Sequence, residues 1–303
     1  MSTQTLAAID LVDEPASAHS GPDAPDATSR GARRRARLRR LRPGVVVAWG
    51  VLAVVVAWAV APGLFTPLDP IAGDAAAALQ APSALHPFGT DATGRDMFAR
   101  VVHGAVQTLS GALVAVAVGL VGGTFLGVVA GSLGGFVDDV LMRVVDVLLA
   151  IPGLLLALSF IIILGFGTVQ AAIAVGIGSI ASFARLSRSE VLRVRGTDYV
   201  EAAYASGGGF WTVLRRHILP NSLTPVLALA ALNFGAAILA ISALGFLGYG
   251  APPPTPEWGL MIAEGRNYIA TAWWLTTLPG LVVVAVVLSA NRLSAAAAER
   301  GRR

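Results

Sequence analysis

The 303-residue sequence contains no cysteine and no lysine. Without cysteine, the chain can form no disulfide and offers no thiolate to a nucleophilic mechanism, a zinc site or an iron–sulfur cluster. Without lysine, it has neither the phosphate-binding lysine of a Walker A loop nor a lysine for Schiff-base chemistry. All 22 basic residues are therefore arginine, and any ATP hydrolysis linked to this chain must take place in a partner subunit.

Charged residues of either sign are also scarce. They make up 13% of the sequence, against 55% hydrophobic residues, and the mean hydropathy is +0.71. A soluble domain of this length needs more charge to cover its surface. Apolar runs of about 20 residues recur, enough to cross a hydrocarbon core of roughly 30 Å as helices, and they lack the alternation of a membrane barrel. We therefore predict an all-α polytopic membrane protein.

We expect six transmembrane helices, and Pro152 should kink or locally unwind the third of them. With a cytoplasmic amino terminus, 19 arginines fall on the cytoplasmic side and only Arg95, Arg100 and Arg266 fall outside. This asymmetry agrees with the positive-inside rule and places both termini in the cytoplasm. The predicted spans are residues 45–65, 106–130, 142–166, 169–184, 223–247 and 272–293.

An arginine-rich run precedes the first apolar segment. Because it adjoins a predicted span and contains no interleaved aromatic residue, we interpret it as a juxtamembrane anchor rather than a nucleic-acid site. The predicted organisation is a disordered cytoplasmic tail that ends in this anchor (1–43), a first transmembrane helix (44–66), an extracytoplasmic segment (67–104), a five-helix core (105–294) that includes a polar loop (188–221), and a cytoplasmic tail (295–303).

The polar loop is a short hydrophilic stretch between long apolar runs. Asp198 is placed to cap a helix whose third residue is Glu201, as in a capping box. Val200, Ala203, Tyr204 and Gly207 then share one face of that helix, which Gly207 and the two glycines after it should end. A second amphipathic helix over 210–218 should follow. The apolar face suits a groove on another protein; alternatively, it lies on the lipid headgroups and Glu201 only caps its own helix.

The loop also carries an ordered set of motifs: Glu201-Ala202-Ala203, Gly207, and then His217-Ile218-Leu219-Pro220-Asn221. This set is similar to the EAA signature of the permeases of binding-protein-dependent ABC importers. Two further motifs resemble the C-type permease of the dipeptide, oligopeptide and nickel branch of that family. They are His86-Pro87-Phe88-Gly89-Thr90-Asp91 with Gly94-Arg95-Asp96, and Leu244–Gly250 followed by Pro253–Gly259 and Glu264-Gly265-Arg266. The resemblance covers about residues 45–293.

The resemblance implies a type I ABC importer permease fold, a multi-pass location in a bacterial inner or plasma membrane, and a chain that is not itself an enzyme. Its implied partners are a second, related permease, two ABC ATPase subunits that bind ATP and Mg²⁺, an extracytoplasmic solute-binding protein and the lipid bilayer. The chain itself is expected to bind no cofactor, no metal and no nucleic acid. The residues implied in ATPase coupling are Val200, Glu201, Ala202, Ala203, Tyr204 and Gly207; those of the loop hinge are His217, Pro220 and Asn221; those of the external motif are Gly89, Thr90, Asp91, Gly94, Arg95 and Asp96.

The substrate and its path are less constrained. Di- and oligopeptides are the default substrates of the family, and nickel–chelator complexes, opines and glycosides remain open. Asn233 either lines the translocation path or hydrogen-bonds another helix. The segments 66–105 and 248–271 are expected to face the solute-binding protein, and Ala251 and Glu257 should be within its reach.

Two hypotheses from other functional classes, a secondary transporter and an intramembrane hydrolase, fit the sequence poorly. A secondary transporter would need ionisable residues at mid-membrane, yet the one candidate, Asp146, is expected to pair with Arg143 near a helix entrance. An intramembrane hydrolase would need catalytic residues at membrane depth. None of the four histidines lies in the middle of a predicted span.

Overall fold

The computed structural model describes residues 43–301, and the predicted disordered tail with its arginine run lies outside this range except for Pro43. Within the described residues the chain is helical and forms no strand, only one isolated bridge between Thr90 and Asp96. The predicted all-α class is confirmed. The helices are α2 (Pro43–Val60), α3 (Met97–Leu133), α4 (Gly135–Ala150), α5 (Gly153–Leu164), α6 (Thr168–Arg195), α7 (Asp198–Ala205), α8 (Phe210–Val213), α9 (Leu219–Phe246), α10 (Trp258–Gly265) and α11 (Trp274–Gly301).

Among the described residues, five helical stretches are long and apolar enough to cross a membrane, and six if α4 and α5 count as one broken span. The axes of α4 and α5 differ by 100°. The break falls at Ile151 and Pro152, because proline lacks the N–H that would continue the helix and its ring collides with the carbonyl four residues earlier. The disruption predicted at Pro152 is confirmed, but the third span is not one helix and it begins at Gly135.

Several helices extend beyond their predicted apolar spans. α3 begins at Met97 because the carboxylate of Asp96 accepts a hydrogen bond from the Ala99 N–H at 2.6 Å and so caps the helix. α6 continues through polar turns to Arg195, and α11 continues to Gly301, so residues 295–301 of the predicted cytoplasmic tail are helical. Hydropathy marks the apolar part of a helix and does not detect polar turns that continue it.

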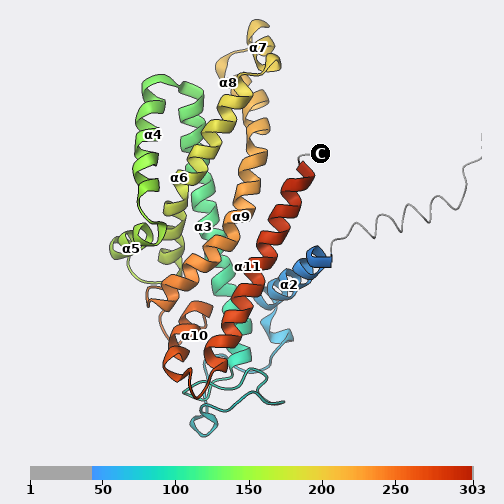
Figure 1. The fold of residues 1–303 in the computed structure, drawn as a ribbon, viewed down its shortest axis with the longest axis vertical. Coiled ribbons are helices and arrows are strands. Elements are labelled where there is room, and N and C mark those ends of the chain that lie inside the picture. Colours follow the sequence, from blue (N-terminus) through green and yellow to red (C-terminus); the bar gives the residue numbers. More distant parts are fainter. Residues whose placement is uncertain (1–42, 302–303) are drawn as a thin grey trace, which may run out of the picture. The chain divides into compact units, whose positions relative to one another are not determined.

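The centre of the fold is the packing of α3 along α6, with α9 against both and α11 against α9 and α2 (Figure 1). Glycines at every fourth position of α3 face α6: Gly119, Gly123, Gly127 and Gly131. A Cβ atom on Gly123 would lie 2.4 Å from the Phe183 Cβ, and one on Gly127 would lie 2.4 Å from the Ala184 carbonyl oxygen. The absence of side chains therefore allows the two backbones to approach closely, as small residues do between helices in lipid.

Replacing Gly127 by alanine should lower the free energy of unfolding by about 1–3 kcal/mol, because the added methyl group cannot fit between α3 and α6 without moving a backbone. Denaturant unfolding of the purified protein in mixed micelles would measure the change. Gly50→Ala is the matched control, since a Cβ on this α2 glycine meets no atom within 4 Å. Equal stability of the two variants would contradict the close-packing interpretation.

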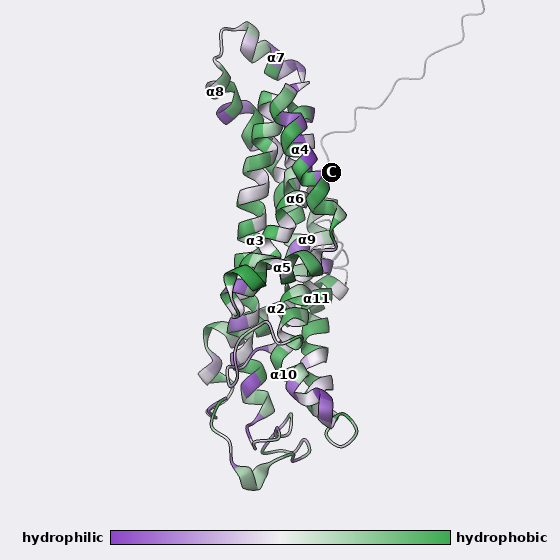
Figure 2. Ribbon diagram, turned by 90° about the vertical axis from the view of Figure 1, so that its left-hand side faces the viewer, coloured by the Kyte–Doolittle hydropathy of each residue, from purple (hydrophilic) through white to green (hydrophobic). Residues whose placement is uncertain are grey.

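The polar elements of the described chain gather at opposite ends of the helices. α7 and α8 lie at one end, whereas α10 and the 67–96 segment lie at the other (Figure 1). Figure 2 shows mostly apolar residues along the helices between these ends and more hydrophilic residues near both ends. This arrangement separates two candidate surfaces by the length of the apolar helices.

Candidate functional site

The helix α7 in the polar loop begins one residue earlier than the capping-box prediction requires. Its N-cap position is Thr197, and Asp198 is its first helical residue. The Thr197 hydroxyl donates to the Val194 carbonyl rather than capping α7, and no side chain forms a cap bond there. The predicted capping box is therefore wrong. Asp198 and Glu201 lie in the first turn, where negative charge still interacts favourably with the helix dipole.

The end of α7 at Gly207 is as predicted. Gly207 has φ +86°, the left-handed conformation that glycine adopts without steric cost. The Gly207 N–H donates to the Tyr204 carbonyl at 2.9 Å, and the Gly208 N–H donates to the Ala203 carbonyl at 3.0 Å. These two bonds form a Schellman motif. A Cβ on Gly207 would meet no atom within 4 Å, so the backbone conformation and not crowding requires glycine here.

Val200 does not belong to the surface that α7 could offer to a partner. It is fully buried in a cluster with Val191 and Val194 of α6 and with Val213 and Ile218. The prediction that it contacts another subunit is therefore wrong; its burial instead fixes α7 against its own chain. Of the other predicted coupling residues, Ala203 is partly buried, and four are exposed: Glu201, Ala202, Tyr204 and Gly207.

A groove of about 430 Å³ opens between α7 and α8. The rings of Tyr199 and His217 both line it, with centroids 6.4 Å apart. The remaining lining residues are small or weakly polar, namely Ala202, Ala203, Ser206, Gly208, Thr212 and Val213. The loop therefore offers a concave surface beside a protruding helix, and not only the apolar helix face that was predicted.

The second predicted helix of the loop is not a separate unit. Residues Phe210–Phe246 form one continuous helical stretch, in which Leu214–Ile218 is a π-helical turn (η3) between α8 and α9. The predicted hinge at His217, Pro220 and Asn221 is therefore not a break. Pro220 has no N–H for an α-helical bond, and the wider π turn precedes it. The Asn221 amide donates to the His217 carbonyl at 2.7 Å.

Three arginines of α6 bond to the neighbouring helices α3 and α4 near the base of the polar loop, and the sequence pattern did not predict these contacts. Arg188 forms a two-pronged contact with Asp138 of α4, both bonds being 2.5 Å. Arg195 donates to the carbonyls at the end of α3. Arg185 pairs with Asp146 at 2.5 Å, so the predicted pairing of Asp146 with Arg143 is wrong.

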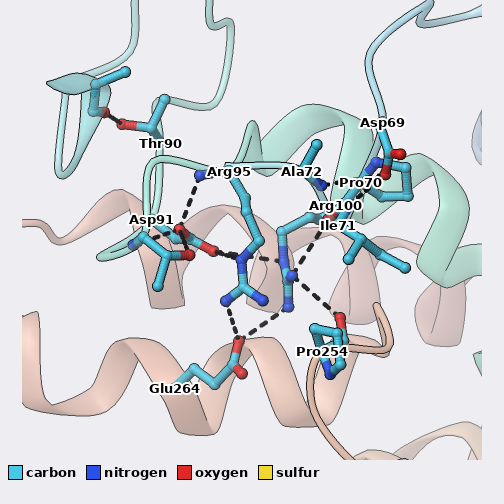
Figure 3. Close-up of polar contacts among 12 residues, drawn as sticks. Asp69, Pro70, Ile71, Ala72, Thr90, Asp91, Arg95, Arg100, Pro254 and Glu264 are labelled. Atoms are coloured by element: carbon cyan, nitrogen blue, oxygen red, sulfur yellow. Dashed lines mark hydrogen bonds and ion pairs between the residues drawn. The ribbon is translucent and has the colours of Figure 1, made fainter. Parts of the chain in front are cut away.

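At the other end of the helices, two arginines and two carboxylates form an ion-pair cluster (Figure 3). Arg95 Nε lies 2.5 Å from Asp91 Oδ2, and Arg100 Nη2 lies 3.0 Å from Glu264 Oε2. Arg95 Nη2 also approaches Glu264, at 3.5 Å, and Arg100 donates to the Pro70 and Pro254 carbonyls. Arg100 is fully buried. The cluster therefore joins the start of α3, the loop before it and α10.

The predicted external motif provides the loop geometry of this cluster. Gly89 and Gly94 have φ +72° and +76°, and a Cβ on Gly94 would lie 1.8 Å from the Asp74 carbonyl oxygen. Thr90 is buried, and its carbonyl accepts a bond from the Trp274 indole at 3.2 Å. Asp96 caps α3 and also bonds to His86 Nδ1 at 2.8 Å. The motif residues hold this segment against α3 and α11.

The charge state of Asp91 follows from its contacts. Burial raises the pKa of this carboxyl, but hydrogen bonds from the Arg95 and Thr93 N–H groups and the Arg95 charge outweigh it, so the pKa lies below its ordinary value. Asp91 is therefore ionised and can hold both arginines. Arg100 and Glu264 were not predicted as site residues, although an arginine just before a long apolar run was a usable signal.

Two expectations about external contacts and the path change with the structure. Ala251 and Glu257 are 5% and 0% exposed, so the prediction that they are within reach of a binding protein is wrong. The Asn233 amide donates to the Leu229 carbonyl of its own helix at 3.0 Å rather than to another helix. Its place in a translocation path stays a prediction.

No group of three potential metal ligands occurs among the described residues.

Known proteins resemble this chain over most of its length. The family described as binding-protein-dependent transport system inner membrane component matches residues 123–303. The probable D,D-dipeptide transport system permease DdpC of Escherichia coli K12 is 42% identical over 223 residues, 74% of this chain and 75% of that protein. The dipeptide transport system permease DppC of Alkalihalophilus pseudofirmus is 44% identical over 215 residues, 71% of each chain.

A solved structure supports the same fold. The inward-facing MetNI methionine ABC transporter contains a chain that matches 66% of this protein and 97% of its own length, with a TM-score of 0.52 and 22% identity. Together with the predicted motifs, these matches confirm the ABC importer permease fold. The chain belongs to the family of binding-protein-dependent transport system inner membrane components.

Proposed function

We propose that this chain is the permease subunit of an ATP-driven importer of di- or oligopeptides, and that it forms half of the translocation pathway. Relatives at about 40% identity are named as dipeptide transport permeases. The observation that carries the proposal is that a chain with these relatives also has a polar loop whose protruding helix is fixed rigidly to the membrane helices. Nickel–chelator complexes, opines and glycosides are the alternative cargoes.

The proposed assembly contains a second, related permease, two ATPase subunits and an extracytoplasmic solute-binding protein. One permease offers a single wall of a pathway, so a closed route needs the second. ATP and Mg²⁺ would be held by the ATPase subunits, because this chain has no lysine for a phosphate loop. In this assembly both termini and the polar loop are cytoplasmic, as the distribution of arginines favours, and α10 lies outside.

The polar loop is suited to transmit movement from an ATPase subunit. The exposed residues Glu201, Ala202 and Tyr204 would form the contact. Because Val200 anchors α7 to α6, a displacement of α7 would move α6 with it. The Arg188–Asp138 contact would pass that movement to α4, which ends at the break before α5. The coupling residues therefore divide into a contact group and an internal anchor.

Reconstitution tests the proposal. The chain, co-expressed with the permease and ATPase genes of its own transport system, should co-purify with them. In proteoliposomes supplied with the binding protein it should take up a radiolabelled dipeptide only with ATP. A panel of peptides, a nickel–chelator complex, an opine and a glycoside identifies the cargo. The chain alone should neither hydrolyse ATP nor transport; uptake by the isolated chain without ATP would contradict the importer assignment.

A further inference from the structure

Glu257 is a fully buried carboxyl group at the start of α10. Its oxygens accept hydrogen bonds from the backbone N–H groups of Gly259 and Leu260, each at 2.8 Å. These bonds make Glu257 the N-cap of α10. Because an N-cap satisfies N–H groups that the helix itself cannot, this carboxyl stabilises the first turn of α10.

The carboxyl occupies a space that glycines leave open beside the end of α9. A Cβ on Gly245 would lie 2.2 Å from Glu257 Oε2, and one on Gly250 would lie 3.5 Å from it. A Cβ on Gly259 would lie 2.2 Å from the Ser242 carbonyl oxygen, so the first turn of α10 rests directly on α9. Docking of α10 is thus what removes the Glu257 carboxyl from water.

Glu257 forms no ion pair among the described residues. The titratable or charged groups of the surrounding elements have other partners: Arg100 of α3 bonds to Glu264 and to the Pro254 carbonyl, the His103 ring bonds to the Ala99 carbonyl, Tyr249 stacks on Phe166, and Arg266 lies over Phe246. An ionised Glu257 is therefore stabilised only by its two backbone N–H groups.

Burial without a counter-charge raises the pKa of Glu257 from 4.5 to about 7, although the two N–H bonds act in the opposite direction. A carboxyl with a raised pKa binds its proton more tightly in the docked form than in water. Protonation therefore stabilises docking. This contribution is complete below pH 4.5 and is lost as the pH rises through about 7.

We propose that Glu257 is a proton-controlled latch on the 248–265 segment. When protonated, it holds α10 against the end of α9. When ionised, it favours undocking of α10 and of the proline-rich residues before it, because undocking returns the carboxylate to water. The latch is a property of this segment and goes beyond the proposed transport function, since it does not depend on which cargo is carried.

Hydrogen–deuterium exchange tests the latch in the full chain, purified with its partner subunits in lipid nanodiscs. Peptides covering residues 248–265 would be followed at about pH 6 and about pH 8, with correction for intrinsic exchange. Opening of this segment should be about tenfold more frequent at about pH 8 than at about pH 6, as expected from a Glu257 pKa of about 7 in the docked form and 4.5 in water. Exchange that is independent of pH after correction would overturn the proposal, whether or not the complex transports peptides.

Three variants identify the group that titrates. Glu257→Gln keeps a hydrogen-bond acceptor but cannot ionise, so its exchange should not change with pH. His103→Gln and Glu264→Gln should keep the tenfold ratio, even if loss of the Glu264 ion pair raises opening at both pH values. A Glu257→Gln variant that retains the ratio would overturn the assignment. If this variant does not assemble, the wild-type protein and Gly245→Ala still test the proposal. The methyl group of Gly245→Ala displaces the carboxyl, so its 248–265 segment should open at both pH values without a tenfold difference between them.

Discussion

Gly207→Val should reduce ATP-dependent uptake by at least tenfold while the protein still inserts and assembles in the membrane. Valine is strained at φ +86°, which costs of the order of 1–3 kcal/mol, and about 1.4 kcal/mol corresponds to a factor of ten. The strain would break the Schellman motif that ends α7 and so misplace Glu201 and Tyr204. Uptake in proteoliposomes, normalised to the amount of assembled complex, measures the effect.

Gly209→Val is the matched control for this prediction. Gly209 lies two residues away, has φ −71° and ψ 154°, and a Cβ there meets no atom within 4 Å. Valine adopts this extended conformation readily, so uptake should remain close to wild type. Equal uptake by the two variants would show that the turn at Gly207 is not needed for coupling. Equal loss would point to a contact along the whole glycine stretch.

Glu264→Gln should lower the free energy of unfolding by about 3 kcal/mol. The substitution removes the carboxylate nearest to Arg100 and leaves a fully buried guanidinium without its principal counter-charge. The expected cost is at the lower end of the range for broken buried ion pairs, because Asp91 Oδ2 still lies 3.8 Å from Arg100 Nε. Denaturant unfolding in mixed micelles provides the measurement.

A double-mutant cycle separates the ion pair from other effects of the substitution. Arg100→Met combined with Glu264→Gln removes the buried charge together with its partner, so the double variant should recover most of the lost stability. The coupling energy between the two sites should exceed about 1 kcal/mol. If the two single effects simply add, the contact between Arg100 and Glu264 does not hold α10 in place.

The two candidate surfaces lie at opposite ends of the same helices. α6 carries the anchors of α7 at one end, and its partner α3 begins in the Arg100 cluster at the other. The close packing between α3 and α6 leaves no room for sliding without steric overlap. Movement of the polar loop would therefore be transmitted by rigid helices rather than absorbed along them.

The helical class, the apolar spans and the turn at Gly207 could be predicted because each rests on local physics. Runs of apolar residues must be helical in lipid, where no water is present to satisfy the backbone. Pro152 has no N–H to continue the helix, and α4 and α5 are separated there, whereas Pro225 and Pro279 lie within continuous helices. Three glycines in succession cannot continue a helix. These properties depend on neighbouring residues alone.

The partners of individual side chains depended on the tertiary structure. Val200 looked like an exposed apolar residue, but the fold brings Val191 and Ile218 against it and buries it. Asp146 pairs with Arg185 of another helix rather than with Arg143 one turn away. The hinge predicted at His217, Pro220 and Asn221 lies in a continuous helix, with a π turn over Leu214–Ile218. In each case a local pattern left several partners within reach, and the packing of helices selected one.

By itself, the sequence determined that this protein is a lysine-free and cysteine-free membrane helix bundle with the motifs of an importer permease. Only the tertiary structure decided that Arg100, Asp91 and Glu264 form one cluster, and that Glu257 is buried without a counter-charge. The reason is physical: local sequence determines which groups a helix carries. Which of those groups meet depends on how segments far apart in the chain pack, as with Arg100 and Glu264, which are 164 residues apart.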